Sequence, residues 1–375
     1  MGHPSRAAVL HAFGEPHRIE DVDLREPGPG EVRVRIVSAG VCHSDVGQAD
    51  GEWDFPLPAV LGHEGAGVVE TVGPGVSGLE PGQRVVLSLA PGCGTCSHCA
   101  VGRPILCQDS LDAMGEGRLT TGPSPLRGAD GPIAAYSLLA CFAEHVVVAA
   151  ASAIPLPDDV PADVAALIGC AVITGVGAAI ETIDVAAGSR GAVFGAGGVG
   201  VNAIQGARAR GGLVDAFDPS EARLEQARRF GAVASGDPTD EQTGERLRAS
   251  ARRAGYDWAI VTVGSGEAIR LAVQAVRPGG TVAVVGLVPQ DRPVPIDMLD
   301  LVTYETRIVG SAYGSLTPLR LVPRIVDLYR SGALRLGELV SARLPLEAID
   351  EAFAQSRSAE GLRPVLAVTN GGAWS

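Results

Sequence analysis

The sequence predicts an α/β protein in which a barrel-like β domain is followed by a doubly wound parallel sheet. Two observations support this fold class. The first 150 residues contain short apolar segments separated by glycine- and proline-rich turns, which is typical of a β barrel. From about residue 175, strand-like segments alternate with helix-like segments of about ten residues, which indicates parallel strands joined by helices.

The strands of the first part are expected where polar and apolar residues alternate between turns. Residues 31–40, EVRVRIVSAG, show this alternation, as a strand with one face toward a core would. Residues 65–73, 82–90 and 142–150 follow as further strand candidates. Together they predict a compact β domain.

The second part is expected to contain strands and helices in strict alternation. The expected strands lie within 189–200, 213–218, 256–264, 281–286 and 307–314, and the expected helices are 201–210, 219–232 and 267–276. The RPGG sequence at 277–280 predicts a turn between the last of these helices and its strand. Two further helices, 317–332 and 345–358, and a strand at 363–368 are expected to follow.

Composition argues against several classes of protein. The chain has 375 residues, of which 46% are apolar and 19% charged, enough for two globular domains. A net charge of −13 argues against nucleic-acid binding. We find no signal peptide and no uncharged apolar run of about 18 residues, so no membrane span is expected. The odd count of seven cysteines favours a reducing cytoplasm over a disulfide framework.

A glycine-rich turn indicates a nucleotide site. The segment GAGGVG places Gly195, Gly197 and Gly200 between an apolar strand and a helix. In that context G-x-G-x-x-G binds a dinucleotide in a Rossmann fold. Gly198 and Val199 are included in the site, because free N–H groups at the start of a helix attract a pyrophosphate.

Asp218 extends this nucleotide site. It follows the next expected strand, 18 residues after Gly200. A carboxylate about 20 residues beyond the glycines binds the adenosine ribose and repels a 2′-phosphate, so NAD is favoured over NADP. Asp218 also fits an N-cap of the helix that begins in DPSEARLE, and both roles are compatible.

Four of the cysteines stand close together. Cys93, Cys96, Cys99 and Cys107 have the spacing C-x2-C-x2-C-x7-C. A ferredoxin-type iron–sulfur run begins in the same way but continues x3-C-P, whereas Gln108 follows the last cysteine here. Four-thiolate zinc is the better fit. Such a closed site has no open position and is therefore structural.

Cys42, His63 and Cys170 are scattered along the chain. Each alone fits a small core residue or a hydrogen-bonded histidine. Together they are the set of two cysteines and one histidine that leaves the fourth position of a zinc ion open for substrate.

Along essentially its whole length the chain resembles the zinc-dependent, medium-chain alcohol dehydrogenases. GHEGAGVVETVGPGV, the four-cysteine lobe, GCAVITGVGAA and GAGGVG stand in the order and at the spacings of that family. The resemblance implies a GroES-like catalytic domain at 1–173 with the zinc lobe at 91–108. It also implies an NAD-binding Rossmann domain at 174–314 and a return to the catalytic domain at 315–375.

The resemblance assigns Cys42, His63 and Cys170 to a catalytic zinc ion and the lobe cysteines to a structural one, so two zinc ions per chain are expected. Zinc would act as a Lewis acid that lowers the pKa of the alcohol before hydride passes to the nicotinamide. Three residues are given supporting roles. Asp45 would orient His63, Glu64 would lie behind the metal, and Ser44 would take the alcohol proton.

The resemblance also assigns residues to the cofactor and the substrate. The cofactor residues beyond the glycine loop and Asp218 are His43, Thr174, Arg223, Val285, Leu287 and Arg363, with His43 and Arg363 at the pyrophosphate. The substrate pocket is expected to contain Trp53, Leu89 and Tyr136. Such an apolar, aromatic wall suits a bulky or aromatic primary alcohol better than ethanol.

Three further features separate branches of the family. The long segment from Cys107 to Phe142 resembles the dimeric members, so a homodimer is expected. Leu111 stands where the glutathione-dependent formaldehyde branch has arginine, which disfavours that substrate. Gly47 stands where many dimeric members have a histidine that ends a proton relay. We expect glycine to leave an opening there, through which water accepts the proton. Cys141 has no assigned role.

Other functions remain open on the sequence. A relative with the same fold and cofactor could reduce a conjugated C=C or C=N bond, although Ser44 and the full zinc triad favour carbonyl chemistry. A non-catalytic nucleotide-binding relative would be expected to have lost zinc ligands. A zinc-containing DNA-binding module is opposed by the net charge of −13.

Overall fold

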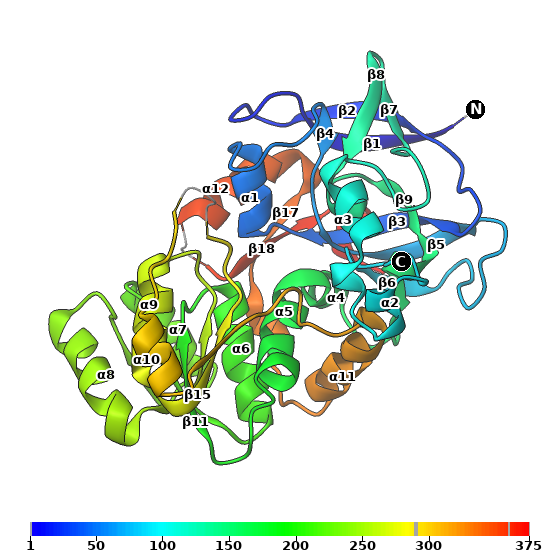
Figure 1. Cartoon of the computed structure of the whole chain (residues 1–375). Coiled ribbons are helices and arrows are strands. Elements are labelled where there is room, and N and C mark those ends of the chain that lie inside the picture. The colour runs from blue at the N-terminus through cyan, green and yellow to red at the C-terminus, as the bar shows by residue number, and fades with distance from the viewer. Residues whose placement is uncertain (1, 289–291, 359–360, 375) are drawn as a thin grey trace. The chain divides into compact units, whose positions relative to one another are not determined.

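The structure is a computed structural model that describes residues 2–288, 292–358 and 361–374 (Figure 1). The chain forms two compact units. The first contains Met1–Cys170, Leu316–Val326 and Leu336–Ser375, and the second contains Ala171–Ser315 and Asp327–Arg335. The first unit is built mainly of β strands and the second of a parallel sheet with helices, so the predicted α/β fold class is confirmed.

The first unit contains a closed barrel and a second sheet. The barrel has the order β1 (His3–Leu10), β2 (Arg18–Leu24), β7 (Leu126–Gly128), β8 (Gly131–Ala135) and β4 (Ala59–Val60). The second sheet has the order β10 (Ala153–Pro155), β6 (Arg84–Leu87), β5 (Glu64–Val72), β3 (Glu31–Gly40), β18 (Arg363–Ala367) and β17 (Val340–Pro345), and β9 (His145–Ala149) also pairs with β3. All four strands predicted before residue 151 are present as β3, β5, β6 and β9.

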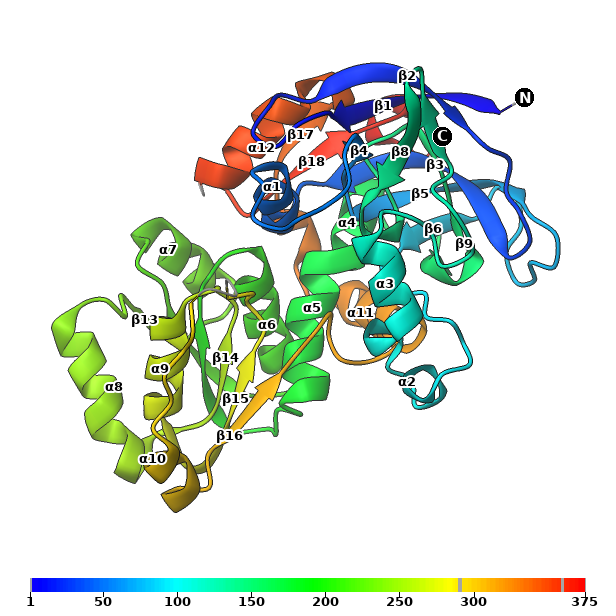
Figure 2. The ribbon, with the colours of Figure 1, turned by 45° about the horizontal axis from the view of Figure 1, so that its top comes forward.

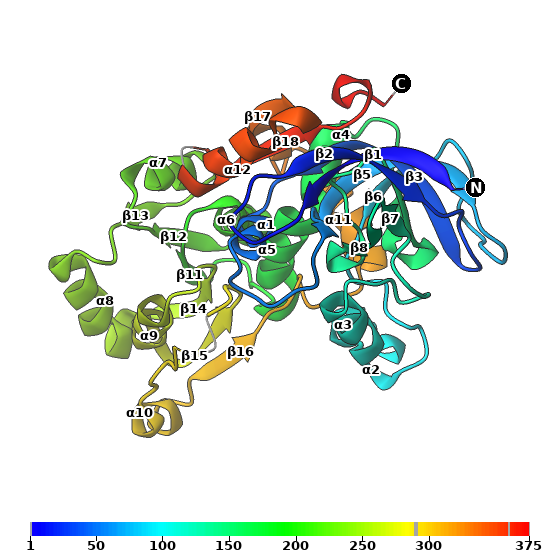
Figure 3. The same cartoon turned by 90° about the horizontal axis from the view of Figure 1, so that it is seen from above.

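Helices pack around these sheets. They are α1 (His43–Ala49), α2 (Ser97–Ala100), α3 (Gln108–Gly115), α4 (Ala162–Leu167) and α12 (Ile349–Ser358), and α11 (Pro318–Arg330) begins in this unit. Figure 3 shows α12 lying against β17 and β18. The core consists mostly of aliphatic side chains with a few phenylalanines, as expected from the low aromatic content of 4%.

The second unit contains a six-stranded parallel sheet. Its order is β13 (Ala234–Gly236), β12 (Leu213–Phe217), β11 (Arg190–Phe194), β14 (Tyr256–Val261), β15 (Val276–Val284) and β16 (Arg307–Gly310). In chain order this is 3-2-1-4-5-6, the Rossmann arrangement. The helices are α5 (Ile173–Gly177), α6 (Gly198–Ala209), α7 (Glu221–Arg229), α8 (Glu241–Ala254), α9 (Gly266–Ala275) and α10 (Met298–Thr303). Figure 2 shows α8 and α9 side by side next to β14 and β15.

One predicted turn lies inside a strand. Residues 277–280 belong to β15, but they break its register with β14: Tyr256 pairs with Val276 and Trp258 pairs with Thr281. Gly279 has a φ of +77°, which bends the chain there. The RPGG sequence therefore forms an irregularity in a continuous strand rather than a loop before it.

The helical segment Ala162–Thr182 was not predicted. By length and composition it could cross a membrane, but 83% of its most apolar stretch is buried inside the protein. Such burial is typical of a core helix. Two π-helical stretches, Ile168–Val172 and Ala178–Thr182, interrupt it, and π turns often occur at functional sites.

Candidate active site and metal clusters

Cys42, His63, Glu64 and Cys170 form one cluster in the first unit, with their ligand atoms all within 4.8 Å of one another. The pairing of β3 with β5 brings the first three together, because Gly40 at the end of β3 lies opposite Glu64 at the start of β5. Cys170 arrives from the π turn after α4, which packs on both strands. Residues 128 positions apart in the sequence thus share one site.

The cluster has the donor chemistry that a zinc ion needs. A hydrogen bond with Cys170, with help from Arg363 and His63, lowers the pKa of Cys42 well below its ordinary value despite burial. The same hydrogen bond and burial raise the pKa of Cys170. The two cysteine side chains are thus hydrogen-bonded to each other at the place where a cation could bind both as thiolates.

Asp45 holds the imidazole of His63. Its Oδ1 lies 2.8 Å from His63 Nδ1 and accepts from the backbone N–H of Gly62 at 3.2 Å, while Oδ2 accepts from Cys42 N at 2.9 Å. Burial alone would lower the pKa of His63, but the charge and hydrogen bond of Asp45 raise it well above the ordinary value. This contact leaves Nε2 as the nitrogen free to bind a metal.

Glu64 and Arg363 form a buried pair beside the cluster. Arg363 Nη1 lies 3.7 Å from Glu64 Oε1 and donates to the carbonyl of Val41 at 3.2 Å. Among the described residues neither carboxylate oxygen of Glu64 has a hydrogen-bond partner, and burial raises the pKa of Glu64 to about 8. The predicted contact of Arg363 with a pyrophosphate stays a prediction, because its guanidinium here faces Glu64 and Val41.

Gly47 does not leave the opening for water that the sequence predicted. Gly47 is buried in α1, and a Cβ atom added to it would lie 2.6 Å from Glu52 Oε2 and 2.9 Å from the ring of Trp53. The space that a histidine side chain would use is therefore filled by these two residues. Ser44 Oγ, one turn earlier, lies 3.8 Å from Cys42 Sγ, and His43 is exposed at the start of the same helix.

The three predicted pocket residues lie in the first unit. The ring of Tyr136 lies 5.9 Å from that of His63 and 5.4 Å from that of Phe55, measured between centroids. Trp53 accepts a hydrogen bond from Gln48 at its carbonyl, and Leu89 packs against the core. Phe55 was missed, although the sequence WDF already held two aromatic residues close together.

The four lobe cysteines also have their sulfur atoms within 4.8 Å of one another. Backbone N–H groups of Cys93 and Cys96 donate to sulfurs of the cluster at 3.3 Å. Hydrogen bonds from Thr95 and neighbouring N–H groups lower the pKa of Cys93 to about 6, so this thiolate forms near neutral pH. No residue of α2 is buried, so the lobe has little core, and a metal cross-link fits it.

The glycine loop is built as predicted from its sequence. Gly195 has a φ of +93°, and a Cβ atom on Gly200 would lie 1.8 Å from the carbonyl oxygen of Gly195, so a side chain is excluded there. Helix α6 begins after Gly197 without a side-chain cap, and nothing lies within 4 Å of a Cβ at Gly197. The first N–H groups of α6 thus remain open to an anion.

Asp218 is buried beside this loop. Its Oδ2 accepts from Ala196 N and its Oδ1 from Ser220 N, both at 2.9 Å, and Arg223 Nη1 lies 3.8 Å from Oδ2. Ser220 caps α7 by accepting from Arg223 N, so Asp218 is not the N-cap. The nucleotide role of Asp218 remains the prediction that its position supports.

Three of the predicted cofactor residues lie elsewhere in the second unit, on elements that follow or pack against this loop. Thr174 is buried in α5, while Val285 and Leu287 follow the end of β15. The backbone N–H of Val285 donates to Val261 O at 2.9 Å, and Leu287 is 68% exposed. Their contacts with the nicotinamide stay predictions.

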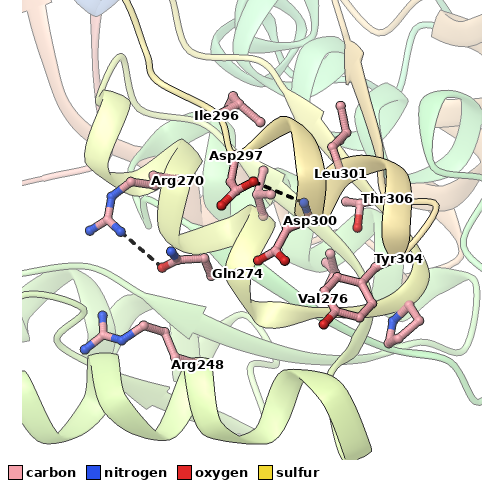
Figure 4. Close-up of a pocket in the computed structure, with 12 residues that line it drawn as sticks. Arg248, Arg270, Gln274, Val276, Ile296, Asp297, Asp300, Leu301, Tyr304 and Thr306 are labelled. Carbon is pink, nitrogen blue, oxygen red and sulfur yellow. Dashed lines mark hydrogen bonds between the residues drawn. The ribbon is translucent and has the colours of Figure 1, made fainter.

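A cavity of about 260 Å³ lies elsewhere in the second unit, lined by α9, α10 and β15 (Figure 4). Arg270 donates to Gln274, and Asp297 accepts from Asp300 N at its rim. None of its lining residues belongs to the cysteine clusters or the glycine loop. The sequence held no signal for this cavity.

Comparison with known proteins identifies the family. Residues 28–158 match the alcohol dehydrogenase GroES-like domain, and residues 198–329 match the zinc-binding dehydrogenase domain. The chain is 36% identical over 371 residues to putative alcohol dehydrogenase D of Mycobacterium tuberculosis, covering 96% of this chain and 98% of that protein. The chain belongs to the zinc-dependent, medium-chain alcohol dehydrogenase family.

Two further relatives support the assignment. Geraniol dehydrogenase of Castellaniella defragrans is 37% identical over 365 residues, covering 96% of this dehydrogenase and 97% of the relative. The crystal structure of benzyl alcohol dehydrogenase from Acinetobacter calcoaceticus superposes with a TM-score of 0.92 at 30% identity, covering 98% and 100% of the two chains. Related structures have been solved with NADP and with NAD. This dehydrogenase is therefore a zinc-type oxidoreductase that acts on CH–OH groups with a nicotinamide cofactor.

Proposed function

We propose that this dehydrogenase is NAD-dependent and interconverts a bulky or aromatic primary alcohol and its aldehyde. The observation that carries the proposal is the cluster of Cys42, His63 and Cys170, beside which the rings of Tyr136 and Phe55 lie. Aromatic walls favour substrates larger than ethanol. The relatives named for geraniol and benzyl alcohol point to the same substrate class.

We further propose two zinc ions per chain. Cys42, His63 and Cys170 would hold the first, and the four lobe cysteines the second. The first would supply Lewis acidity that lowers the pKa of the alcohol hydroxyl. Asp45 keeps Nε2 of His63 directed at the ligand set. Glu64, whose buried carboxylate has no hydrogen-bond partner in the part of the chain that the structure describes, would complete the electrostatic environment behind the site.

The proton of the alcohol is proposed to pass to Ser44 Oγ and to leave toward Glu52. Ser44 and Gly47 are three residues apart on α1, so they share one face of the helix. The carboxylate of Glu52 lies where a side chain at position 47 would begin, and it is exposed to solvent. A carboxylate at the surface can accept a proton and release it to water.

Asp218 supports the preference for NAD. Its carboxylate is fixed by two backbone N–H groups next to the glycine loop. A second negative charge on a 2′-phosphate would be repelled there, and Arg223, which faces Asp218 at 3.8 Å, is already engaged by that carboxylate. The remaining cofactor residues, Thr174, Val285, Leu287, His43 and Arg363, are proposed by family resemblance alone.

A homodimer is proposed as the functional unit. The edge strand β16 and helix α10 carry exposed apolar side chains: Met298 is 62% exposed, Leu299 76%, Val302 71% and Ile308 37%. An unpaired sheet edge beside apolar side chains is the kind of surface that a second copy covers. Val302→Glu should dissociate the dimer in light scattering, whereas Leu319→Glu, at an exposed apolar residue of α11, should not.

The test of the proposed reaction is to measure turnover of a panel of alcohols, with the absorbance of the nicotinamide cofactor as the readout. Benzylic and terpenoid primary alcohols should give a higher kcat/KM than ethanol, with NAD preferred over NADP. Conjugated enones and imines would test reduction of a C=C or C=N bond. Turnover of these compounds without any alcohol oxidation would overturn the proposal.

We place the protein in the cytoplasm. None of the seven cysteines is joined in a disulfide bond, which suits a reducing compartment.

A further inference from the structure

A third group of metal-binding side chains lies outside both cysteine clusters. His3 of β1, Glu70 of β5 and His145 of β9 each offer a ligand atom, and these atoms all lie within 4.8 Å of one another. All three residues belong to the first unit and are partly accessible to solvent. None of them is used by the proposed reaction.

The sheet register explains how the three side chains meet. Strand β3 lies between β5 and β9, and Arg35 of β3 pairs with His145. On the other side, Arg33 pairs with Thr71 and Val34 with Val69, so Glu70 is the extra residue of a β-bulge. A bulge redirects a side chain, and here His145 Nε2 lies 3.6 Å from Glu70 Oε1 across β3.

His3 completes the group from the N-terminal strand. The backbone N–H of His145 donates to Ser5 Oγ at 3.0 Å, which holds β1 beside the start of β9. The rings of His3 and His145 are 4.5 Å apart between centroids, at an angle of 77°. An edge-to-face arrangement of this kind lets ring nitrogens of both residues point at one position.

The ligand atoms are available for a cation. Arg33 Nε and Arg35 Nε lie 3.4 and 3.6 Å from Glu70, longer than strong ion-pair contacts. Both arginines have other partners, Glu26 for Arg33 and Thr369 for Arg35, each at 3.2 Å. If Glu70 bound a cation, Arg33 would keep its contact with Glu26 through Nη1 and Arg35 its contact with Thr369 through Nη1.

His145 adds a second observation. Its Nδ1 is buried and has no hydrogen-bond partner among the described residues. Burial lowers the pKa of His145, which keeps the imidazole in the neutral form that binds metals. The nitrogen that faces Glu70 is Nε2, at 3.6 Å from Oε1.

We propose that His3, Glu70 and His145 form a third metal site, which takes zinc or a similar divalent transition-metal ion with water in the remaining position. Two imidazoles and one carboxylate suit zinc, copper and nickel, whereas magnesium and calcium prefer sites made of oxygen ligands. The ion would connect β1, β5 and β9 and so fasten the N-terminal strand to the second sheet.

The experiment is a titration of zinc into enzyme whose two cysteine clusters are already loaded with zinc. Isothermal calorimetry monitors the titration, and elemental analysis counts the zinc ions bound per chain. The wild type should bind one more zinc ion per chain than His145→Asn, and magnesium should not compete. His3→Asn and Glu70→Gln should each weaken this binding by about tenfold or more, as the loss of a ligand would. His11→Asn is the matched control, because His11 pairs with Glu20 at 2.8 Å outside the three-ligand group.

A second measurement separates metal binding from a folding defect. Added zinc should raise the unfolding temperature of the wild type and of His11→Asn, but not that of the three ligand variants. All variants should keep wild-type alcohol oxidation, which shows that they fold. Equal zinc stoichiometry in the wild type and His145→Asn, or no further zinc in either, would overturn the proposal and identify an ion-pair cluster without a metal.

Discussion

Asp45 Oδ1 lies 2.8 Å from His63 Nδ1, and both side chains are buried. The same carboxylate accepts hydrogen bonds from the backbone of Cys42 and Gly62. Asp45 thus connects the backbone of Cys42 to the segment that carries His63. A substitution at Asp45 should therefore alter the orientation of His63 without removing any of the proposed ligands.

Replacing Asp45 by Asn should therefore weaken the site while leaving its ligands in place. We expect zinc affinity or kcat/KM to fall by about 10–100-fold, the range seen when a partner of a metal-bound histidine is changed. Competition with a chelator and steady-state kinetics measure the two quantities. Asp50→Asn, at an exposed pair with Arg357, serves as the control. Wild-type values in Asp45→Asn would contradict the orienting role.

The two cysteine clusters should respond differently to substitution. Cys170→Ala should remove detectable turnover while the protein stays folded, because we propose that its cluster holds the zinc ion with an open position. Cys99→Ala should first lower the unfolding temperature, since a closed zinc site in a lobe whose helix α2 has no buried residue would contribute folding free energy. Calorimetry, zinc analysis and activity distinguish the two outcomes. Unchanged thermal stability in Cys99→Ala would argue against the structural role.

Asp218→Gly should shift the cofactor preference toward NADP. Removal of the carboxylate next to the glycine loop abolishes its repulsion of a 2′-phosphate. We expect the ratio of kcat/KM for NADP to that for NAD to rise by about tenfold or more, which corresponds to about 1.4 kcal/mol. Glu221→Gln, an exposed carboxylate at the start of α7, should leave the ratio unchanged. A wild-type enzyme that already prefers NADP would refute the assignment.

Glu52→Gln tests the proposed path of the alcohol proton. The change keeps the size of the side chain that covers Gly47 but removes its ability to accept a proton. Alcohol oxidation in a single turnover should slow by up to about 10²-fold, and added buffer base should restore part of the rate. Glu116→Gln, at an exposed carboxylate of another loop, is the control. Gly47→His should lower stability, because Glu52 and Trp53 occupy that space.

The buried His17 predicts a dependence of stability on pH. Burial lowers its pKa below the ordinary 6.5, and the hydrogen bond to Asp350 offsets only part of this effect. In the range just below pH 6.5 the unfolded chain binds more protons than the folded one, so the free energy of unfolding falls as the pH falls. Above that range His17 is neutral in both the folded and the unfolded chain, so it no longer makes the free energy of unfolding depend on pH.

His17→Gln should reduce this slope. Denaturant unfolding at a series of pH values measures the slope. At higher pH the free energies of unfolding of the two proteins should differ by an amount that does not change with pH. A variant with the full wild-type slope would show that other groups cause the acid sensitivity.

Several features could be predicted from local sequence alone, because their information lies in neighbouring residues. The alternation in 31–40 predicted strand β3, since side chains of a strand point to opposite faces in turn. The segment GAGGVG predicted the turn before α6, because Gly195 needs a positive φ and Gly200 excludes a side chain. The spacing of Cys93, Cys96, Cys99 and Cys107 likewise predicted that their sulfurs would meet.

Other features were decided by tertiary structure. No local pattern shows that Glu52 and Trp53 cover Gly47, because this depends on how the chain folds back after α1. The RPGG sequence has the chemistry of a turn, yet pairing with β14 keeps those residues within β15. His3, Glu70 and His145 are far apart in the sequence. The pairing of β3 with β5 and β9, a bulge at Glu70 and the contact of Ser5 on β1 with His145 bring them together. Sheet register is set by contacts between distant segments, so residues that meet through it leave no signal in their own neighbourhood.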